Sequence, residues 1–373
     1  MRIDWVVYRP DAVYVWSKKE VREALEWYRM VMNNEAPAKF IIARNLEAGE
    51  PPSTLSDEEL WRLHGKLEGE FRRMWIDALN GGLRLNWDSR VENSFLEVKV
   101  EIAGRMLRKC MFCERRCGVD RASGRKGFCG LDSRVLVATY FHHIGEEAPL
   151  VPSGTIFYCG CNFKCVYCQN WDISQERPYR GDVVSARELA LIQEELRESG
   201  ARNINHVGGD PTPNTHLILE SMLYIRVNVP QIWNSNFYMT PECMRLLKDV
   251  IDLWLPDFKY WRNECALKLS SAPRYREVVT RNLKVAAENG DMIIRHLVLP
   301  NHVECCTKPI LEWIAENLPR NKVIVNIMDQ YRPEYLVARK PYEWEEIARR
   351  VTSEEMREAR RRAEELGLLH DLV

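Results

Sequence analysis

Three cysteines in one short loop, Cys161, Cys165 and Cys168, are the residues best suited to chemistry. They are separated by three and then two residues and follow the apolar run 155–158. Thiolates at this spacing can converge on one soft metal centre, and an iron–sulfur cluster is a natural occupant. A cubane cluster held entirely by protein takes four cysteines. Three ligands would leave one iron with an open coordination position, which is where metal chemistry takes place.

A second group of four cysteines precedes this loop: Cys110, Cys113, Cys117 and Cys129. The first three have one two-residue and one three-residue spacing, and four thiols so arranged predict a metal site. Zinc in a tetrahedral thiolate cage is one candidate occupant, and a second iron–sulfur cluster is the other. Zinc sites more often have two-residue spacing in both halves, so the pattern leaves the metal open.

The other five of the twelve cysteines are scattered or lie outside ligand spacing: Cys159, Cys243, Cys265, Cys305 and Cys306. Cys159 is expected to be a buried thiol at a strand end, because free cysteine packs as a small hydrophobic residue. The adjacent Cys305 and Cys306 are expected to form a buried pair at a helix start rather than a reactive one. His302 lacks ligand spacing, so no metal is assigned to it.

The composition describes a globular protein and argues against several classes of partner. The 373 residues are 46% hydrophobic and 29% charged, which allows a sizeable core. A formal net charge of -1 gives no overall basic field that would recruit nucleic acid or an acidic membrane. No apolar run of about 18 residues predicts a membrane span, and the N-terminus lacks the apolar core of a signal peptide. We therefore expect a cytoplasmic protein whose cysteines bind metal rather than form disulfides.

From residue 154 onward, apolar runs of strand length alternate with helical patterns. The runs cover residues 155–158, 204–207, 231–233, 251–255, 293–299 and 323–328. The helices between them have clear starts, with Ser185 and Glu188 forming one capping box and Thr240 capping another helix before Pro241. This alternation implies parallel pairing with right-handed crossovers. The predicted fold is α/β, a partial barrel of six strand–helix units.

Polar residues recur at the ends of these six strands. The three-cysteine loop follows the first strand, and the later strands carry Gly208-Gly209-Asp210, Asn234-Ser235-Asn236, Asp257 with Lys259, Arg295 with His296, and Asp329-Gln330. In α/β barrels the functional groups lie at the carboxyl ends of the strands. We therefore expect these side chains to line one mouth.

Three further segments flank the barrel, which is predicted to span residues 151–335. Residues 1–108 form a helical extension, in which Ser56 and Glu59 make a capping box and a second helix covers about 96–107. Residues 109–150 form the four-cysteine metal-binding segment, and residues 336–373 form C-terminal helices. One of these helices is expected over 342–350, and another is expected between Thr352 and Gly367. The extension is predicted to pack on the main domain.

The cysteine loop, the Gly-Gly-Asp-Pro turn at Gly208 and the Asp-x-Lys element at Asp257 together resemble the radical S-adenosylmethionine (SAM) superfamily. Within it, the chain looks most like proteins related to the pyruvate formate-lyase activating enzyme. More narrowly, it resembles the subgroup whose turn reads Gly-Gly-Asp-Pro-Thr-Pro-Asn, here residues 208–214. The resemblance covers about residues 110–335.

The resemblance implies cofactors and roles for particular residues. The three cysteines of the loop would hold a 4Fe–4S cluster whose fourth iron is chelated by the amino and carboxylate groups of SAM. Tyr167 would pack beside the adenine, and Gly208 and Gly209 would let the backbone approach the SAM amino group. Asp210 stands where many relatives have Glu, which implies a shorter or water-mediated contact.

The remaining implied roles concern the later strand ends. Ser235 and Asn236 would lie near the ribose or carboxylate of SAM, and Arg295 and His296 are further candidates for cofactor binding. Asp257 and Lys259 match an element at the active-site mouth of the activating enzymes and are the catalytic candidates.

The resemblance also implies a reaction. One electron enters the cluster, SAM is cleaved to methionine and a 5′-deoxyadenosyl radical, and this radical abstracts hydrogen from a substrate. The first hypothesis is an activating enzyme that acts on a glycine of a partner protein, and the second is an enzyme acting on a small metabolite or RNA. An iron–sulfur electron carrier or zinc-stabilised interaction module is disfavoured by the open-iron triad and the SAM-type turn. A one-electron reductant such as a ferredoxin or flavodoxin is the expected partner.

Overall fold

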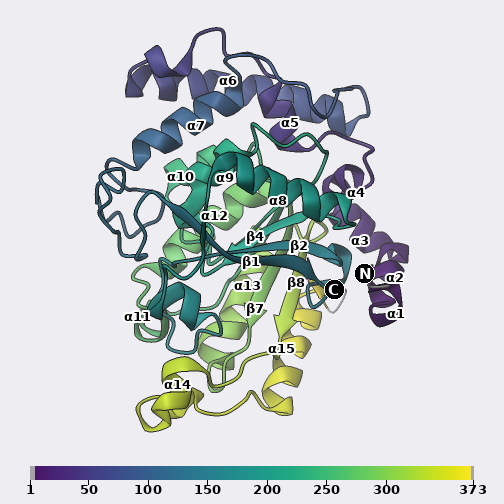
Figure 1. Cartoon of the computed structure of the whole chain (residues 1–373). Helices are drawn as coiled ribbons and strands as arrows, with labels where there is room; N and C mark the ends of the chain where they lie inside the picture. Colours follow the sequence, from purple (N-terminus) through teal and green to yellow (C-terminus); the bar gives the residue numbers. More distant parts are fainter. Residues whose placement is uncertain (1–4, 371–373) are drawn as a thin grey trace.

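A computed structural model describes residues 5–370, and in it one sheet forms the centre of the molecule (Figure 1). The strand order is β3-β1-β2-β4-β5-β6-β7-β8-β9. The strands are β1 (Val135–His143), β2 (Ser153–Tyr158), β3 (Asp182–Val184), β4 (Ile204–Gly208), β5 (Gln231–Ser235), β6 (Leu253–Pro256), β7 (Asp291–Leu297), β8 (Val323–Met328) and β9 (Leu369–His370).

The six predicted strands are confirmed as β2 and β4 to β8. They pair in parallel, each with the next in that order. The short β9 adds in parallel to β8, while β3 ends the other side of the sheet. Because the two outer strands are not joined, the sheet is an open, partial barrel, which confirms the predicted fold class.

An antiparallel addition was not predicted. The long β1 pairs antiparallel with β2 and with β3, so the segment that carries the four cysteines also contributes a strand to the sheet. The first three residues of β1 are buried, but Tyr140 and Phe141 are exposed. The apolar residues of β1 therefore do not alternate with the period of two that marks a half-buried strand.

Helices cover the sheet between the strands. They are α8 (Ala186–Glu198), α9 (Thr215–Ser221), α10 (Pro241–Leu247), α11 (Asn263–Ser270), α12 (Tyr275–Glu288) and α13 (Lys308–Asn317). Both predicted caps are confirmed, because Ser185 Oγ accepts from the Glu188 amide at 3.3 Å and Thr240 Oγ1 accepts from the Cys243 amide at 3.2 Å. These side chains satisfy amides that have no partner inside the helix.

The N-terminal extension is helical, as predicted. Its helices are α1 (Trp5–Tyr8), α2 (Asp11–Tyr14), α3 (Lys19–Ala24), α4 (Glu26–Met32), α5 (Lys39–Arg44), α6 (Asp57–Leu79) and α7 (Phe95–Met106). The capping box of Ser56 with Glu59 starts α6, and Ser94 with Glu97 starts α7 in the same way. In Figure 1, α5, α6 and α7 lie together at the top of the molecule, over the helices that flank the sheet.

The helices α2 to α4 close the amino-terminal end of the barrel. Their buried side chains, such as Ala12 of α2 and Val21 of α3, share a core with Ile232 of β5, Leu253 of β6 and Ile293 of β7. Polar contacts reinforce this packing, since Trp27 Nε1 donates to Asp252 at 2.8 Å and the Tyr28 amide donates to Asp291 at 2.8 Å. Both aspartates lie at the beginnings of strands. The helices α2 to α4 therefore form the floor of the barrel, whereas the rest of the extension lies elsewhere.

The C-terminal segment differs from prediction at one helix. The helix α15 (Ser353–Glu365) starts at the predicted Thr352 cap, and a short α14 (Tyr335–Arg339) precedes it. The helix predicted over 342–350 is wrong, because this stretch forms two 3-10 turns, Pro341–Glu343 and Glu345–Ile347. Tertiary hydrogen bonds from Asn301 Nδ2 and Tyr331 Oη occupy the carbonyls of Glu346 and Ile347, which a longer helix would need.

Short helical turns complete the described structure. The other 3-10 turns are η1 (Val15–Ser17), η2 (Pro52–Thr54), η3 (Ala148–Leu150) and η5 (Thr212–Asn214), and the π-helical turns are η4 (Asp172–Glu176) and η6 (Val303–Thr307). Within residues 5–370, no helix has the length and apolar character needed to cross a membrane.

Candidate metal centre and active site

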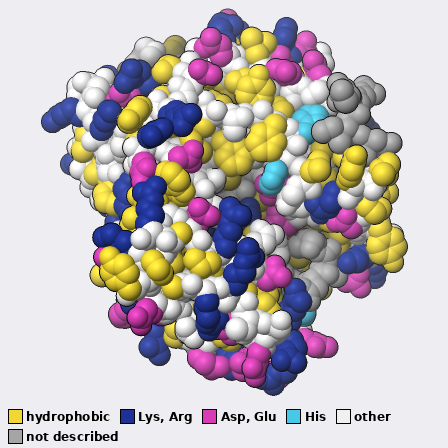
Figure 2. All heavy atoms as spheres, turned by 60° about the horizontal axis from the view of Figure 1, so that its bottom comes forward, with side chains coloured by type: hydrophobic (Ala, Val, Ile, Leu, Met, Phe, Trp, Pro, Cys, Tyr) yellow, Lys and Arg dark blue, Asp and Glu magenta, His cyan; other side chains and the backbone are white. Residues whose placement is uncertain are grey.

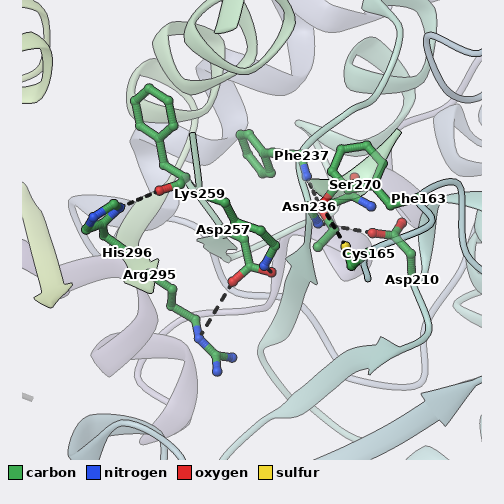
Figure 3. Close-up of polar contacts among 12 residues, drawn as sticks. Phe163, Cys165, Asp210, Asn236, Phe237, Asp257, Lys259, Ser270, Arg295 and His296 are labelled. Carbon is green, nitrogen blue, oxygen red and sulfur yellow. Dashed lines mark hydrogen bonds and ion pairs between the residues drawn. The ribbon is translucent and has the colours of Figure 1, made fainter. Parts of the chain in front are cut away.

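A cavity lies at the carboxyl ends of the parallel strands, opposite the floor made by α2 to α4. Most of the predicted site residues line it: Cys161, Cys165, Cys168, Tyr167, Gly208, Gly209, Asp210, Ser235, Asn236, Asp257, Lys259 and Arg295. Figure 3 shows Asp257, Lys259 and Arg295 on one side of this region and Cys165, Asp210 and Asn236 on the other. The expectation that polar residues at the carboxyl ends of the strands line one mouth therefore agrees with this cavity.

Backbone hydrogen bonds hold the cysteine loop at two places. At its beginning, the Asp210 amide donates to the carbonyl of Gly160 at 3.0 Å, which ties the loop to the end of β4. Gly160 has φ of 78°, and a Cβ there would lie 2.6 Å from Leu131, so only glycine fits. Further along, the amides of Lys164 and Val166 donate to carbonyls in the last turn of α11 at 3.1 and 2.9 Å.

Each thiol of the loop has a hydrogen-bonding partner. The Phe163 amide donates to Cys161 Sγ at 3.3 Å, Ser270 Oγ donates to Cys165 Sγ at 3.0 Å, and Cys168 Sγ lies 3.4 Å from Ser174 Oγ. The two serines were not predicted, because they come from α11 and η4 and carry no local motif. Hydrogen bonds to the sulfurs are one of the factors that set the reduction potential of an iron–sulfur cluster.

Burial shapes the chemistry of these thiols. It raises the pKa of Cys161 well above its ordinary value and that of Cys165 to about 12, although Lys259 opposes the shift at Cys165. Without metal, both groups would therefore stay protonated at neutral pH. A metal that binds thiolates releases these protons, so ligation is what makes the site anionic.

Tyr167 belongs to a hydrogen-bonded chain that leads to the cysteine loop. Its hydroxyl contacts the hydroxyl of Tyr260, which lies 2.7 Å from Ser270 Oγ. The ring is buried and packs edge-on against Tyr331. Tyr167 therefore presents a fixed aromatic wall to the cavity, and its predicted contact with adenine stays a prediction.

The glycine pair at the end of β4 is required by packing of the backbone. A Cβ on Gly208 would lie 2.1 Å from the Tyr158 nitrogen, and a Cβ on Gly209 would lie 2.1 Å from the Gly160 oxygen. Gly208 also has φ of 107°, which disfavours other residues. Both glycines thus let β4 approach the start of the cysteine loop, in addition to facing the cavity.

Asp210 joins two strand ends. Its Oδ1 accepts from the Thr212 amide at 2.9 Å, and its Oδ2 accepts from the Asn236 amide at 3.0 Å. Burial raises the pKa of this carboxyl group to about 6, against the effect of these hydrogen bonds. Each carboxylate oxygen keeps a second lone pair, so the group can still accept from a ligand.

A charged network occupies the other side of the cavity. Lys259 Nζ lies 2.6 Å from Asp257 Oδ2, and Arg295 Nε lies 4.0 Å from Asp257 Oδ1. Burial would lower the pKa of Lys259, but Asp257 and Cys165 outweigh it and raise this pKa. Arg295 also lies 3.4 Å from Glu147 and 3.8 Å from Glu146, two buried carboxylates that the sequence did not indicate.

Arg295 and His296 do not share an environment. Neighbouring residues of a strand point to opposite faces, so β7 can direct only one of them into the barrel. Arg295 lines the cavity, whereas His296 is buried on the other face, with Nδ1 2.7 Å from the Phe258 carbonyl oxygen and Nε2 2.9 Å from Thr307 Oγ1. This placement gives no support to the predicted role of His296 in cofactor binding.

The four cysteines of the second group also come together. Burial raises the pKa of Cys113, and charge on the nearby Cys129, Cys110 and Cys117 adds to this shift. Gly127 separates Cys117 and Cys129, since a Cβ there would lie 3.4 and 3.5 Å from their sulfurs. The segment is held to the sheet domain by an isolated bridge between Cys113 and Met239.

Arg115 lies between the two cysteine groups. Its Nε donates to the Asn162 carbonyl at 2.8 Å, and its guanidinium stacks 4.0 Å above the centre of the Phe128 ring. Negative charge on Cys113, Cys161 and Cys165 would stabilise this cation, whereas burial lowers its pKa. One arginine therefore connects the four-cysteine segment with the loop of the triad.

The match to known families agrees with this geometry. The model of the radical SAM superfamily matches residues 155–314, which include the cysteine loop and every strand from β4 to β7. Residues 155–314 therefore form a domain of the radical SAM superfamily. Such a domain implies an enzyme that uses a 4Fe–4S cluster and SAM, the two cofactors that the resemblance of the sequence implied.

Relatives of this radical SAM protein occur in Methanocaldococcus jannaschii. The uncharacterised protein MJ0674 is 43% identical over 351 residues, which cover 93% of this chain and 98% of that protein. The uncharacterised protein MJ0808 is 24% identical over 278 residues, 66% of this chain and 78% of that protein.

Solved structures show more distant likeness. SuiB of Streptococcus suis bound to S-adenosylmethionine aligns with a TM-score of 0.42 and 12% identity, over 56% of this chain and 47% of SuiB. TYW1 with a lysine–pyruvate adduct aligns with a TM-score of 0.37 and 10% identity, over 57% of this chain and 73% of TYW1. The chain thus spans less than half of SuiB, and at TM-scores below 0.5 neither structure indicates a substrate.

The residues of the cavity fit both groups that the superfamily implies. The three sulfurs are farther apart than the ligands of a single metal ion. Among the described residues of the cavity, no three ligand atoms of His, Cys, Asp or Glu all lie within 4.8 Å of one another. Sulfurs around one tetrahedral zinc would lie about 3.8 Å apart, because Zn–S bonds measure about 2.3 Å. Asn234 Nδ2, a buried donor in the cavity wall, has no hydrogen-bonding partner among the described residues and could meet a polar ligand.

Proposed function

We propose that this radical SAM enzyme is of the activating type and takes a hydrogen atom from a glycine of a partner protein. One observation carries the proposal: a single cavity joins the three thiols to the charged pair of Asp257 and Lys259. The Asp-x-Lys element is the feature by which the sequence resembles the activating enzymes. This element lies on the cavity wall across from the thiols, where it would contact a substrate that enters the cavity.

The residues of the chain divide the work of such a site. Cys161, Cys165 and Cys168 would hold the cluster, which together with SAM would supply the 5′-deoxyadenosyl radical for hydrogen abstraction. Asn234 and Ser235 offer polar groups to the bound cofactor. The floor made by α2 to α4 closes the barrel below the site and keeps water from entering there.

The face around the strand ends supports a protein partner over a nucleic acid. The arrow of β8 points toward the lower part of Figure 1, and Figure 2 brings this end forward. Lys, Arg, Asp and Glu side chains are interspersed on this face without a dominant sign. RNA recognition relies on a concentrated positive surface, which this face lacks. A one-electron reductant such as a ferredoxin or flavodoxin, and a cytoplasmic location, complete the proposal.

The central test is SAM cleavage by the anaerobically reconstituted chain with a strong reductant. We expect wild type to form 5′-deoxyadenosine and Cys165→Ala to form none, because the variant lacks one of three cluster ligands. Cys159→Ala is the matched control, since Cys159 is buried two residues before the triad and its thiol donates to the carbonyl of Arg180. Equal rates in wild type and Cys165→Ala would contradict the assignment of the triad.

A second test identifies the class of substrate. Cells grown in deuterium-enriched medium supply protein, RNA and small-metabolite fractions, and each is added to the enzyme with unlabelled SAM. Hydrogen abstraction from a labelled substrate transfers deuterium into 5′-deoxyadenosine, which mass spectrometry detects. We expect transfer from the protein fraction. Transfer from the metabolite or RNA fraction alone would replace the activating-enzyme proposal by the second hypothesis.

We also propose that the four-cysteine segment holds a metal centre of its own. Like the triad, it contains no three ligand atoms within 4.8 Å of one another among the described residues. This wide spacing favours a second iron–sulfur cluster over zinc. Iron per chain should then fall by about half in Cys113→Ala, because a 4Fe–4S cluster is lost from one of two sites.

A further inference from the structure

Four side chains without an assigned role meet outside the cavity: Cys265, His302, Cys305 and Cys306. One ligand atom from each lies within 4.8 Å of all the others. Cys265 lies in α11, and the other three lie at η6, in the connection between β7 and α13. We call these four residues the Cys3His group. Of the expected buried pair, Cys306 is buried but Cys305 is only half-buried, and both belong to this larger set.

The distances within the Cys3His group match a tetrahedral zinc site. Cys305 Sγ lies 3.8 Å from Cys306 Sγ and 3.3 Å from His302 Nδ1. With Zn–S bonds of about 2.3 Å and Zn–N bonds of about 2.0 Å, tetrahedral geometry places two sulfurs about 3.8 Å apart and a sulfur and a nitrogen about 3.5 Å apart. An iron–sulfur cluster would need its ligands farther apart.

The π-helical turn explains how two adjacent cysteines can face the same point. The amides of Cys306 and Thr307 both donate to the His302 carbonyl, at 2.9 and 3.2 Å. Consecutive side chains of an α-helix diverge by about 100°. The wider turn of a π-helix reduces this angle, and such turns occur often at functional sites.

The surroundings suit bound thiolates. His302 and Cys306 are buried, and Cys265 and Cys305 are half-buried. The backbone amides of Arg262 and Trp261 donate to the sulfur of Cys306. Amides that donate to a ligand sulfur are typical outer partners of a metal site.

Another compact set of ligand types in the chain lacks these features. His64, Glu68 and Asp249 also lie close together, but Lys99 Nζ lies between them, 3.0 Å from His64 Nε2 and 2.8 Å from Asp249 Oδ2. An ammonium group already neutralises that set. The hydrogen bonds of the Cys3His group run instead among its own ligand atoms and to backbone groups.

We propose that Cys265, His302, Cys305 and Cys306 bind one zinc ion that fastens α11 to the connection between β7 and α13. The ion would stabilise the active site although it lies outside the cavity. The reason is that the last turn of α11 carries Ser270, and its carbonyl groups accept hydrogen bonds from backbone amides of the cysteine loop. This inference does not depend on the activating-enzyme proposal.

The first experiment counts zinc and iron per chain in the anaerobically reconstituted full-length protein. Cys265→Ser and Cys306→Ser should each lose about one zinc per chain with iron unchanged. Cys243→Ser, a substitution of a buried cysteine outside the group, should keep this zinc, and so should Cys113→Ser. Equal zinc in wild type and in both Cys3His variants would overturn the proposal.

A second measurement uses the wild-type chain, since a substitution at a buried ligand can prevent folding. Cys265 and Cys305 are partly accessible, so an alkylating reagent should modify them only after a strong zinc chelator is added. Peptide mass spectrometry reports each site. Modification without chelator overturns the proposal, and so does modification that requires a reductant, because that result indicates a disulfide between Cys305 and Cys306.

Discussion

At the scale of single residues, the cavity is defined by what donates to each sulfur. The sulfur of Cys161 accepts a hydrogen bond from a backbone amide, whereas the sulfur of Cys165 accepts one from the hydroxyl of Ser270. Ser270 is itself bonded to Tyr260, which contacts Tyr167 on the cavity wall. A donor stabilises the more negative, reduced state of a cluster more than the oxidised state. The hydroxyl of Ser270 should therefore tune the potential at which the enzyme accepts an electron.

Ser270→Ala should lower the reduction potential of the cluster. Loss of a hydrogen bond worth about 1 kcal/mol corresponds to roughly 40 mV for one electron. A redox titration followed by electron paramagnetic resonance measures the shift. Ser221→Ala is the control, because this buried hydroxyl bonds Gln193 and Ile218, away from the cysteines. A potential that is the same in Ser270→Ala and wild type would show that the bond does not reach the cluster.

His206 should make stability depend on pH. It is buried in β4 between the hydroxyl of Tyr158 and the side chain of Gln231, and burial lowers its pKa to about 4. The unfolded chain, with a histidine pKa near 6.5, binds a proton that the folded chain does not. Stability is therefore lost as the pH falls below about 6.5.

The measurement compares the free energy of unfolding of wild type and His206→Gln. The stability advantage of wild type should shrink by about 3 kcal/mol between pH 7 and pH 4, because glutamine takes up no proton. Chemical denaturation at each pH gives this difference directly. A constant difference would mean that His206 has the same pKa in the folded and unfolded chains.

At the scale of elements, the end of β4 and the start of α10 each perform two tasks. The end of β4 turns through Gly208 and Gly209 and also supports the cysteine loop. The start of α10 is capped by Thr240, whose Oγ1 also donates to the Met111 carbonyl at 2.7 Å, next to the second cysteine group. Local structure and site geometry thus depend on the same atoms.

Thr240→Ala should weaken both the helix and the four-cysteine segment. The loss of the cap costs about 1 kcal/mol, and the lost contact with Met111 adds to it. Ser185→Ala is a matched N-cap control that touches no metal segment, so it should cost about 1 kcal/mol and leave the metal content unchanged. Metal analysis after mild heating compares the two. Equal retention of metal would show that Thr240 acts only as a cap.

At the scale of the whole molecule, the barrel is closed at one end by the N-terminal helices and open at the other to the cavity. The extension is attached by buried ionic contacts as well as by packing. Lys99 of α7 lies 2.8 Å from Asp249, and both side chains are almost inaccessible to water. This contact joins the extension to the segment that precedes β6.

Lys99→Met should destabilise the protein by about 3–5 kcal/mol, because it leaves the carboxylate of Asp249 buried without its partner. Denaturant titration measures the change. Arg62→Ala removes an exposed ion pair with Glu58 and should change stability by less than about 1 kcal/mol. A small effect of Lys99→Met would mean that other cations, such as Lys248, compensate for the lost charge.

The sequence alone determined the features that depend on local spacing and period. The cysteine loop, the six parallel strands and the caps at Ser56, Ser185 and Thr240 were all predicted, because each depends on residues within a few positions of one another. The polar residues at the strand ends then predicted most of the residues that line the cavity, since parallel strands bring their carboxyl ends to one edge of the sheet.

Only the tertiary structure decided which distant groups meet. Because side chains of β7 alternate between its two faces, Arg295 faces the cavity and His296 does not. The packing of α11 also brought the hydroxyl of Ser270 to the sulfur of Cys165. It also joined Cys265 to the ligands around His302, which no spacing in the sequence could indicate. The physical reason is the same in each case. A motif records ligands that share one loop, whereas a contact between two elements exists only once their packing has placed them side by side.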